Sequence, residues 1–175
     1  MKTLEKIETG RPEEIIWTLR GGEQIINRIQ AMLSRAKSEI IMCIPAVTDL
    51  SLFVATISAL CSRRIRVRLT FRTEDIPYLT SLPPDPYLQI RLITPSRPND
   101  KDSLPFTHPD RHIIPHGSRI VVIDESEILF TFTGVQDREM GIWAKSHGLV
   151  SIFKFFYEQF WTFAAPLEEV LKKSG

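Results

Sequence analysis

The segment from His116 to Asp124 carries the residue types of a phosphodiester-cleaving site. In the H-x-K-x4-D pattern, a histidine attacks phosphorus, a lysine holds the phosphoryl oxygens and an aspartate completes the site. Counting back from Asp124, the lysine position holds Arg119 and the histidine position holds Gly117, so His116 is one residue out of register. Side chains alternate along a strand, and this shift points the imidazole away from the side to which Arg119 points. The nucleophile is therefore missing, and Arg119 and Asp124 are left as an anion-binding pair or as a plain cross-strand ion pair.

A second candidate site is a local cluster of arginines. Arg66 and Arg68 share one face of an expected strand, and Arg64 lies just before it. Guanidinium groups in this arrangement can bind a phosphate or a sugar phosphate. The same side chains can instead pair with acidic residues of a neighbouring strand or subunit, which is the commoner arrangement. The cluster consists of Arg63, Arg64, Arg66, Arg68, Arg72 and Arg91.

Histidines and cysteines do not form a convincing metal site. His108, His112 and His116 are spaced four apart, but Pro109 and Pro115 interrupt the helix that would align them. The two cysteines, Cys43 and Cys61, fall in an expected strand and an expected helix, far from other ligand types. We therefore expect no metal and no cofactor, and two reduced cysteines in the core.

The elements that position these residues alternate between strands and helices. Apolar residues at helical spacing and β-branched runs predict a strand at 15–17, a helix from 25 to 36–38, a strand at 39–44, a helix capped by Thr48 or Asp49, and a strand at 65–71. Nine prolines fall between 77 and 115, where only residues 88–93 read as a strand and residues 94–116 as a long loop. A hairpin at 118–133, a short strand near 142–145, an aromatic helix at 149–163 and a polar tail helix at 167–173 follow. The aromatic helix is expected to be buried against the sheet or in a dimer interface.

The composition is typical of one globular domain with almost no net charge. The 175 residues are 43% hydrophobic and 25% charged, with a formal net charge of +1, which excludes disorder and non-specific binding to nucleic acid through net charge. We expect residues 1–12 to be a tail and 13–175 to be the domain. The polar start and the lack of a long apolar run predict a cytoplasmic protein without membrane contact.

Five segments of the sequence resemble a known family. A short W-T-L-R-G strand leads into a helix, an A-K-x-E-I segment precedes the next strand, and an R-I-R-V strand, a V-V-x-D strand and an aromatic helix follow. They are Trp17–Gly21, Ala36–Ile40, Arg64–Val67, Val121–Asp124 and Phe153–Trp161. Over residues 13–165 the chain resembles the effector domain of TrmB-type archaeal transcriptional regulators.

The resemblance implies an α/β fold of the phospholipase-D-like type, a single domain with a mixed β-sheet flanked by helices and a degenerate catalytic motif. Members of the family join this domain to a winged helix-turn-helix and use it to sense sugars or other small effectors. Here the chain starts at Met1, just before the effector domain, so we expect no direct DNA contact. We expect a non-enzymatic regulatory domain that senses a small polar ligand such as a sugar or sugar phosphate. The alternative mode of action is pairing, either as a homodimer through the aromatic helix or a sheet edge, or with full-length regulators.

A ligand would lie at the carboxyl ends of the strands. This places Asp49, Arg72 and Asp124 around it, with Arg119 nearby and with Arg64, Arg66 and Arg68 as an anion patch. The alternative function is a residual phosphodiesterase or nuclease that uses His116 and Arg119.

Overall fold

Strands and helices alternate in the first half of the chain, as the sequence predicts. The computed structural model describes residues 14–43, 51–72, 76–79, 82, 84–93, 118–133 and 139–174. Its elements are β1 (Ile15–Arg20), α1 (Gly22–Arg35), β2 (Glu39–Cys43), α2 (Val54–Ser62), β3 (Arg66–Arg72), α3 (Ile76–Leu79), β4 (Leu88–Ile93), β5 (Ile120–Ile123), β6 (Glu127–Thr133), β7 (Glu139–Lys145), α4 (His147–Phe163), β8 (Ala165–Pro166) and α5 (Leu167–Ser174).

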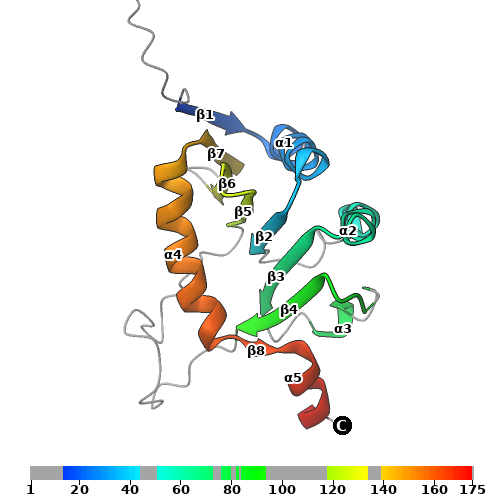
Figure 1. The fold of residues 1–175 in the computed structure, drawn as a ribbon. Helices are drawn as coiled ribbons and strands as arrows, with labels where there is room; N and C mark the ends of the chain where they lie inside the picture. The colour runs from blue at the N-terminus through cyan, green and yellow to red at the C-terminus, as the bar shows by residue number, and fades with distance from the viewer. Residues whose placement is uncertain are drawn as a thin grey trace, which may run out of the picture.

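These strands form one mixed sheet in the order β1-β7-β6-β5-β2-β3-β4-β8. The strands β2, β3 and β4 run parallel to one another, and every other pairing in the sheet is antiparallel. The helix α4 lies on one side of the sheet, and α1 and α2 lie on the other (Figure 1). The predicted fold class, a mixed sheet flanked by helices, is confirmed.

The central strand β2 is buried on both faces, which explains its unbroken apolar run. Ile40 and Met42 belong to the core beneath α1 and α2, whereas Ile41 belongs to a second core beneath α4. Each of these three side chains is at most 1% exposed. Neighbouring residues of a strand face opposite sides, so β2 contributes to both cores.

The next strand, β3, divides its residues by chemistry. Val67, Leu69 and Phe71 enter the core beneath α1 and α2. Arg68 and Thr70 lie on the opposite face, where both are buried. A buried arginine is unfavourable unless its charge is paired. Arg68 therefore needs acidic and aromatic partners on the α4 side of β3.

The helix α1 follows its apolar spacing closely. Ile25, Ile29, Met32 and Leu33 recur at helical intervals, and all four are fully buried. The turn before the helix is Gly21, whose φ of 87° is a left-handed conformation that glycine adopts without cost.

The aromatic helix α4 is buried against the sheet on one side only, and the alternative burial in a dimer interface stays a prediction. Only Val150 and Tyr157 are fully buried along it, and Leu149, Phe153 and Trp161 pack partly against the core. Four large apolar side chains point away from the sheet, each about half exposed or more: Ile152, Phe155, Phe156 and Phe163. A helix of this composition presents apolar residues all round, whereas the sheet covers only one side of it.

Several predictions fall on residues that the structure does not describe. They include the Thr48 or Asp49 cap of α2, the loop at 94–116 and the three histidines His108, His112 and His116. In the described part of the chain, no helix combines the length and the apolar character needed to cross a membrane.

Candidate functional site

Arg119, at the lysine position of the phosphodiesterase pattern, is engaged in an ion pair. Its guanidinium lies 2.8 Å from Oε1 of Glu139 on β7, and its side chain is only 11% exposed. Its backbone N–H donates to Oγ1 of Thr131, which keeps the start of β5 beside β6. His116 and Gly117 lie outside the described residues. The positive charge that would hold a phosphoryl group is thus compensated by a carboxylate.

Glu139 also meets the beginning of α1. Its backbone carbonyl accepts a hydrogen bond of 2.9 Å from the N–H of Gly21. Its carboxylate lies so close to Gly22 that a Cβ on this residue would be 2.6 Å from Oε2. The carboxylate therefore sits at the positive end of the helix dipole as well as beside Arg119.

Asp124 lies at the amino end of the parallel strand β2, whereas the sequence predicted a place at the carboxyl ends of the strands. Because β5 runs antiparallel to β2, the residue after β5 meets the beginning of β2 rather than its carboxyl end. The carboxylate accepts hydrogen bonds from the backbone N–H groups of Lys37, Ser38 and Glu39 at 2.7, 2.8 and 3.1 Å, and from the Ser38 hydroxyl at 2.9 Å. The prediction that Asp124 lies beside Asp49 and Arg72 is therefore wrong, and in this structure Asp124 ties two strands together.

These contacts shift the titration of Asp124. Partial burial raises the pKa of its carboxyl group, but the hydrogen bonds from Ser38, Glu39 and Lys37 together outweigh burial. The pKa is therefore lower than the ordinary value near 3.8.

The arginine patch divides into paired and exposed residues. Arg68 lies 2.7 Å from Glu158 of α4 and 3.1 Å from Glu39 of β2, and its side chain is only 9% exposed. The guanidinium also lies over the rings of Tyr157 and Trp161, with its central carbon 5.4 and 5.5 Å from the ring centroids.

Arg66 approaches the same Glu39 carboxylate at 3.4 Å but remains exposed. Arg64 is also exposed, and its φ of 62° places it in a turn. Acidic partners on a neighbouring strand and on a helix thus engage Arg66 and Arg68, the second of the two alternatives that the sequence left open. The side chain of Arg72 and all of Asp49 lie outside the described residues.

Lys154 of α4 extends this charged cluster. Its ammonium group lies 3.1 Å from Glu39 and 2.6 Å from Glu125. Burial lowers the pKa of Lys154, but the hydrogen bonds to Glu125 and Glu39 outweigh burial and leave the pKa raised. For Tyr157, in contrast, burial itself raises the pKa of the hydroxyl group, which lies 3.0 Å from Thr70 Oγ1. The inner side of α4 is held to β2 and β3 by this mostly buried polar layer.

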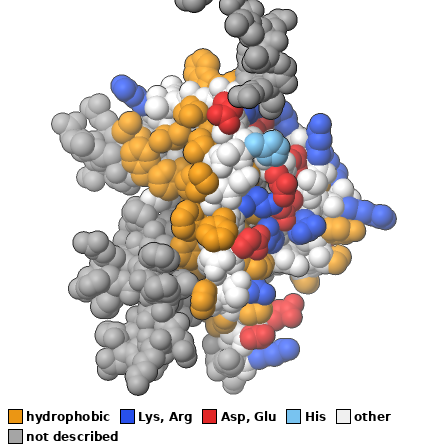
Figure 2. Space-filling model, turned by 60° about the vertical axis from the view of Figure 1, so that its left-hand side comes forward, with side chains coloured by type: hydrophobic (Ala, Val, Ile, Leu, Met, Phe, Trp, Pro, Cys, Tyr) orange, Lys and Arg blue, Asp and Glu red, His pale blue; other side chains and the backbone are white. Residues whose placement is uncertain are grey.

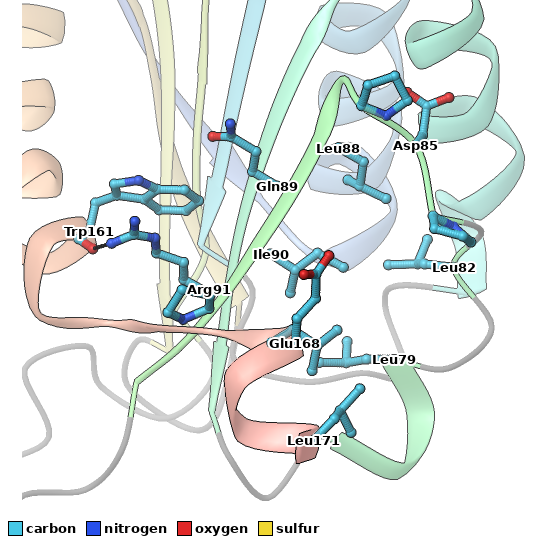
Figure 3. Close-up of a pocket in the computed structure, with 14 residues that line it drawn as sticks. Leu79, Leu82, Asp85, Leu88, Gln89, Ile90, Arg91, Trp161, Glu168 and Leu171 are labelled. Carbon is cyan, nitrogen blue, oxygen red and sulfur yellow. Dashed lines mark hydrogen bonds between the residues drawn. The ribbon is translucent and has the colours of Figure 1, made fainter. Parts of the chain in front are cut away.

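A groove at the β4 end of the sheet is a site that sequence reasoning missed. It has a volume of about 750 Å³ and lies between β4, α5 and the segment before β4 (Figure 3). Arg91 is held on one side of it, because its guanidinium donates to the carbonyl of Trp161 and lies 4.9 Å from the centroid of that ring. The sequence signal is the run of prolines before residues 88–93, which is typical of an edge strand. The lining residues are Leu79, Leu82, Pro84, Asp85, Pro86, Leu88, Gln89, Ile90, Arg91, Trp161, Pro166, Leu167, Glu168 and Leu171.

Metal-ligand types do not gather anywhere in the described ranges: no group of three or more histidine, cysteine, aspartate and glutamate side chains there could hold an ion. Cys43 and Cys61 are both buried and free of disulfides, as predicted.

Comparison with known proteins gives structural relatives only. No protein-family model matches the sequence, and no curated protein matches it. The archaeal chromatin protein TrmBL2, described with a novel mode of DNA binding, superimposes with a TM-score of 0.65 at 20% identity, over 91% of this chain and 56% of TrmBL2. The chain thus spans little more than half of TrmBL2.

Two further solved structures share the fold over nearly their whole length. NucT from Helicobacter pylori superimposes with a TM-score of 0.63 at 12% identity, over 88% of this chain and 99% of NucT. Nuc from Salmonella typhimurium, a phospholipase D family member, gives a TM-score of 0.59 at 11% identity, over 88% of this chain and 98% of Nuc. The chain has the phospholipase-D-like fold, the same fold as the matching part of an archaeal chromatin protein.

Proposed function

We propose that this chain is a non-catalytic regulatory module of the TrmB type that acts by pairing through the outer face of α4, with a second copy or with a full-length regulator. The observation that carries the proposal is the outer face itself, defined here by Ile152, Phe155, Phe156 and Phe163. These side chains are 54, 64, 49 and 58% exposed. Their spacing of three, four and seven residues places them on one side of the helix.

The outer face continues onto the sheet. Phe153 lies beside Phe130, with ring centroids 6.0 Å apart, and Phe130 lies beside Phe132 at 5.8 Å. Ile142, directly opposite Phe130 on β7, is 37% exposed. Apolar side chains form a continuous band on this side of the molecule (Figure 2). A contiguous exposed patch of this kind is typical of a protein interface.

The charge pattern favours a second copy as the partner. A two-fold symmetric interface brings residues near its axis close to their own copies, so unpaired charges there would repel. The charged residues of α4, Lys154 and Glu158, contact Glu39 and Arg68 on the inner side. At roughly 200 Å² per large side chain, the outer face and Ile142 expose roughly 500 Å², at the lower limit of a stable interface. We therefore expect a weak dimer.

The described geometry gives less support to the phosphodiesterase alternative. Arg119 is compensated by Glu139, and Asp124 is occupied by three backbone N–H groups. The sequence also places Gly117 where the pattern needs its nucleophile.

Sedimentation velocity over a hundredfold range of protein concentration tests pairing. We expect the sedimentation coefficient of the wild-type chain to rise with concentration, and Phe156→Glu to remain monomeric. Leu52→Glu is the matched control, because Leu52 is a 53% exposed apolar residue that lies outside α4, just before α2. A wild-type chain that is monomeric throughout, or a Phe156→Glu chain that pairs normally, would contradict the proposal.

The same module is proposed to sense a small polar effector through Asp49 and Arg72. Thermal unfolding with sugars, sugar phosphates and nucleotides tests this, since a ligand at about 100 times its Kd adds about 2.7 kcal/mol. We expect one class to raise the Tm, and we expect Asp49→Ala and Arg72→Ala to abolish the shift while Asp124→Asn retains it. A Tm that no compound of the panel raises, or a shift that both alanine variants retain, would remove the effector from the proposal.

A further inference from the structure

The outer edge of β4 is only partly covered. The two-residue strand β8 pairs with Arg91 and Leu92 alone, and the sheet order ends there. Within the described ranges, no strand pairs with the outer side of residues 88–90. Such an edge presents backbone donors and acceptors to which another strand can add.

The backbone groups on this edge follow from the register with β3. The N–H of Val67 donates to the carbonyl of Tyr87, so the backbone groups of Tyr87 and Gln89 face β3. Backbone direction alternates along a strand, and the groups of Leu88 and Ile90 therefore face the groove. The N–H of Leu88 is already bonded to the carbonyl of Asp85 at 3.0 Å. The Leu88 carbonyl and the Ile90 N–H remain directed to the groove, whereas the Ile90 carbonyl faces Leu167 where β8 ends.

The side chains show that the groove runs along the edge. Four consecutive residues of β4, Leu88 to Arg91, line it. Consecutive side chains belong to opposite faces of the sheet, so a single hollow can touch all four only by following the edge itself. Figure 3 shows Gln89 and Arg91 on the Trp161 side of the strand and Leu88 on the side of Asp85. A groove that follows the edge of a strand fits an extended chain better than a compact molecule.

The walls define the chemistry of that chain. On one side lie the apolar groups of Leu82 and Leu171. Asp85 and Glu168 are both acidic and both line the groove, whereas its cation, Arg91, is bound to Trp161. Apolar walls with acidic groups match a chain in which apolar and basic residues alternate.

We propose that this groove binds an extended peptide segment of alternating apolar and basic residues, which pairs with β4 as an additional strand. Apolar side chains of the peptide contact the leucine wall, and basic side chains contact Glu168 and Asp85. The groove includes Trp161 of α4 but none of the residues of the outer face, so this inference does not depend on the proposed pairing.

Titration of the isotope-labelled full chain, followed by NMR, tests the proposal with a seven-residue peptide of alternating valine and lysine. We expect saturable shifts of the amide signals of β4 and α5. A peptide with an N-methyl group on every residue should bind at least fivefold more weakly, because neither of its edges can donate backbone hydrogen bonds to β4. A peptide of alternating valine and glutamate should do the same through charge repulsion.

Two neighbouring glutamates supply a matched control. Glu168 and Glu169 are both exposed in the first turn of α5, but only Glu168 lines the groove. We expect Glu168→Lys to weaken binding of the valine–lysine peptide at least threefold at low salt and Glu169→Lys to change it less than twofold.

Three results would overturn the proposal: no saturable shifts, equal binding of the N-methylated peptide, or shifts confined to α4. The last would place the peptide on the pairing surface. Unchanged sedimentation of Glu168→Lys would show that pairing and peptide binding are separate.

Discussion

Asp124 shows that a motif residue can serve the fold instead of the chemistry. It keeps the aspartate of the H-x-K-x4-D pattern, but its carboxylate is bonded to the backbone at the beginning of β2. The sequence predicted the strand and the turn that follows it. The direction of β5 relative to β2 depends on pairing between distant residues, which local pattern does not show.

Replacing Asp124 by asparagine tests the contribution of these hydrogen bonds to stability. Asparagine tolerates the observed φ of 49° but cannot accept from both Lys37 and Ser38. We expect a loss of about 1–2 kcal/mol in the free energy of unfolding at pH 7, measured by urea denaturation.

The pH dependence of that loss has a definite sign. The pKa of Asp124 is lowered in the folded state, so its ionised form stabilises the fold above the unfolded pKa near 3.8. The contribution disappears as the pH falls from about 4 through the folded pKa. We expect the difference between wild type and Asp124→Asn to shrink at pH 3, and equal differences at both pH values would contradict this role.

Arg68 and Arg66 form a second residue-scale test. Both contact Glu39, but the side chain of Arg68 is 9% exposed and that of Arg66 is 62% exposed. Removing Arg68 takes the ion-pair partner from Glu158 and leaves Glu39 with Lys154 and Arg66. It also leaves a space over the rings of Tyr157 and Trp161. We therefore expect Arg68→Ala to lower the free energy of unfolding by about 3 kcal/mol. Arg66→Ala should change it by about 0.5 kcal/mol or less. Comparable losses in urea denaturation would show that burial does not separate the two arginines.

At the scale of elements, the start of α1 depends on a close approach that sequence patterns do not reveal. The two glycines at 21 and 22 predicted a turn, but only the structure shows that they differ. Gly21 has a positive φ and open space around it, whereas Gly22 is crowded by the Glu139 carboxylate.

A double-mutant cycle separates the two glycines. We expect Gly21→Ala to cost about 1 kcal/mol through its left-handed conformation, whatever residue stands at 139. Gly22→Ala should cost a similar amount, about 1 kcal/mol, by displacing the Glu139 side chain. That second cost should vanish in a Glu139→Ala background, measured by thermal unfolding. A cost at Gly22 that persists without Glu139 would assign it to the backbone instead.

At the scale of the molecule, the spacing of apolar residues predicted most helices and strands, because each of them buries one face or both. The strand β2 and the helix α1 were readable from their apolar residues alone. The burial of α4 was not, since its composition is apolar on every side and the sheet covers only one. The groove was not readable either, because it depends on where the short strand β8 stops along β4.

Pairing through α4 also has a consequence for the whole molecule. Association stabilises the folded chain by mass action, so the Tm should rise with protein concentration. We expect this rise for wild type and for Leu52→Glu, and a constant Tm for Phe156→Glu, measured by scanning calorimetry. A Tm independent of concentration in all three would mean that the outer face of α4 does not contribute to folding stability.

The position of β1 also affects how the chain folds during synthesis. This strand is made well before its partner in the sheet, β7, and Arg20 pairs with Met140. A ribosome adding about 5–20 residues per second needs roughly ten seconds to make the intervening stretch. Until then the apolar residues Ile15, Ile16 and Trp17 have no sheet to join. The edge strand β1 of a nascent chain therefore stays unpaired until β7 has been made, and it joins the sheet after the central strands.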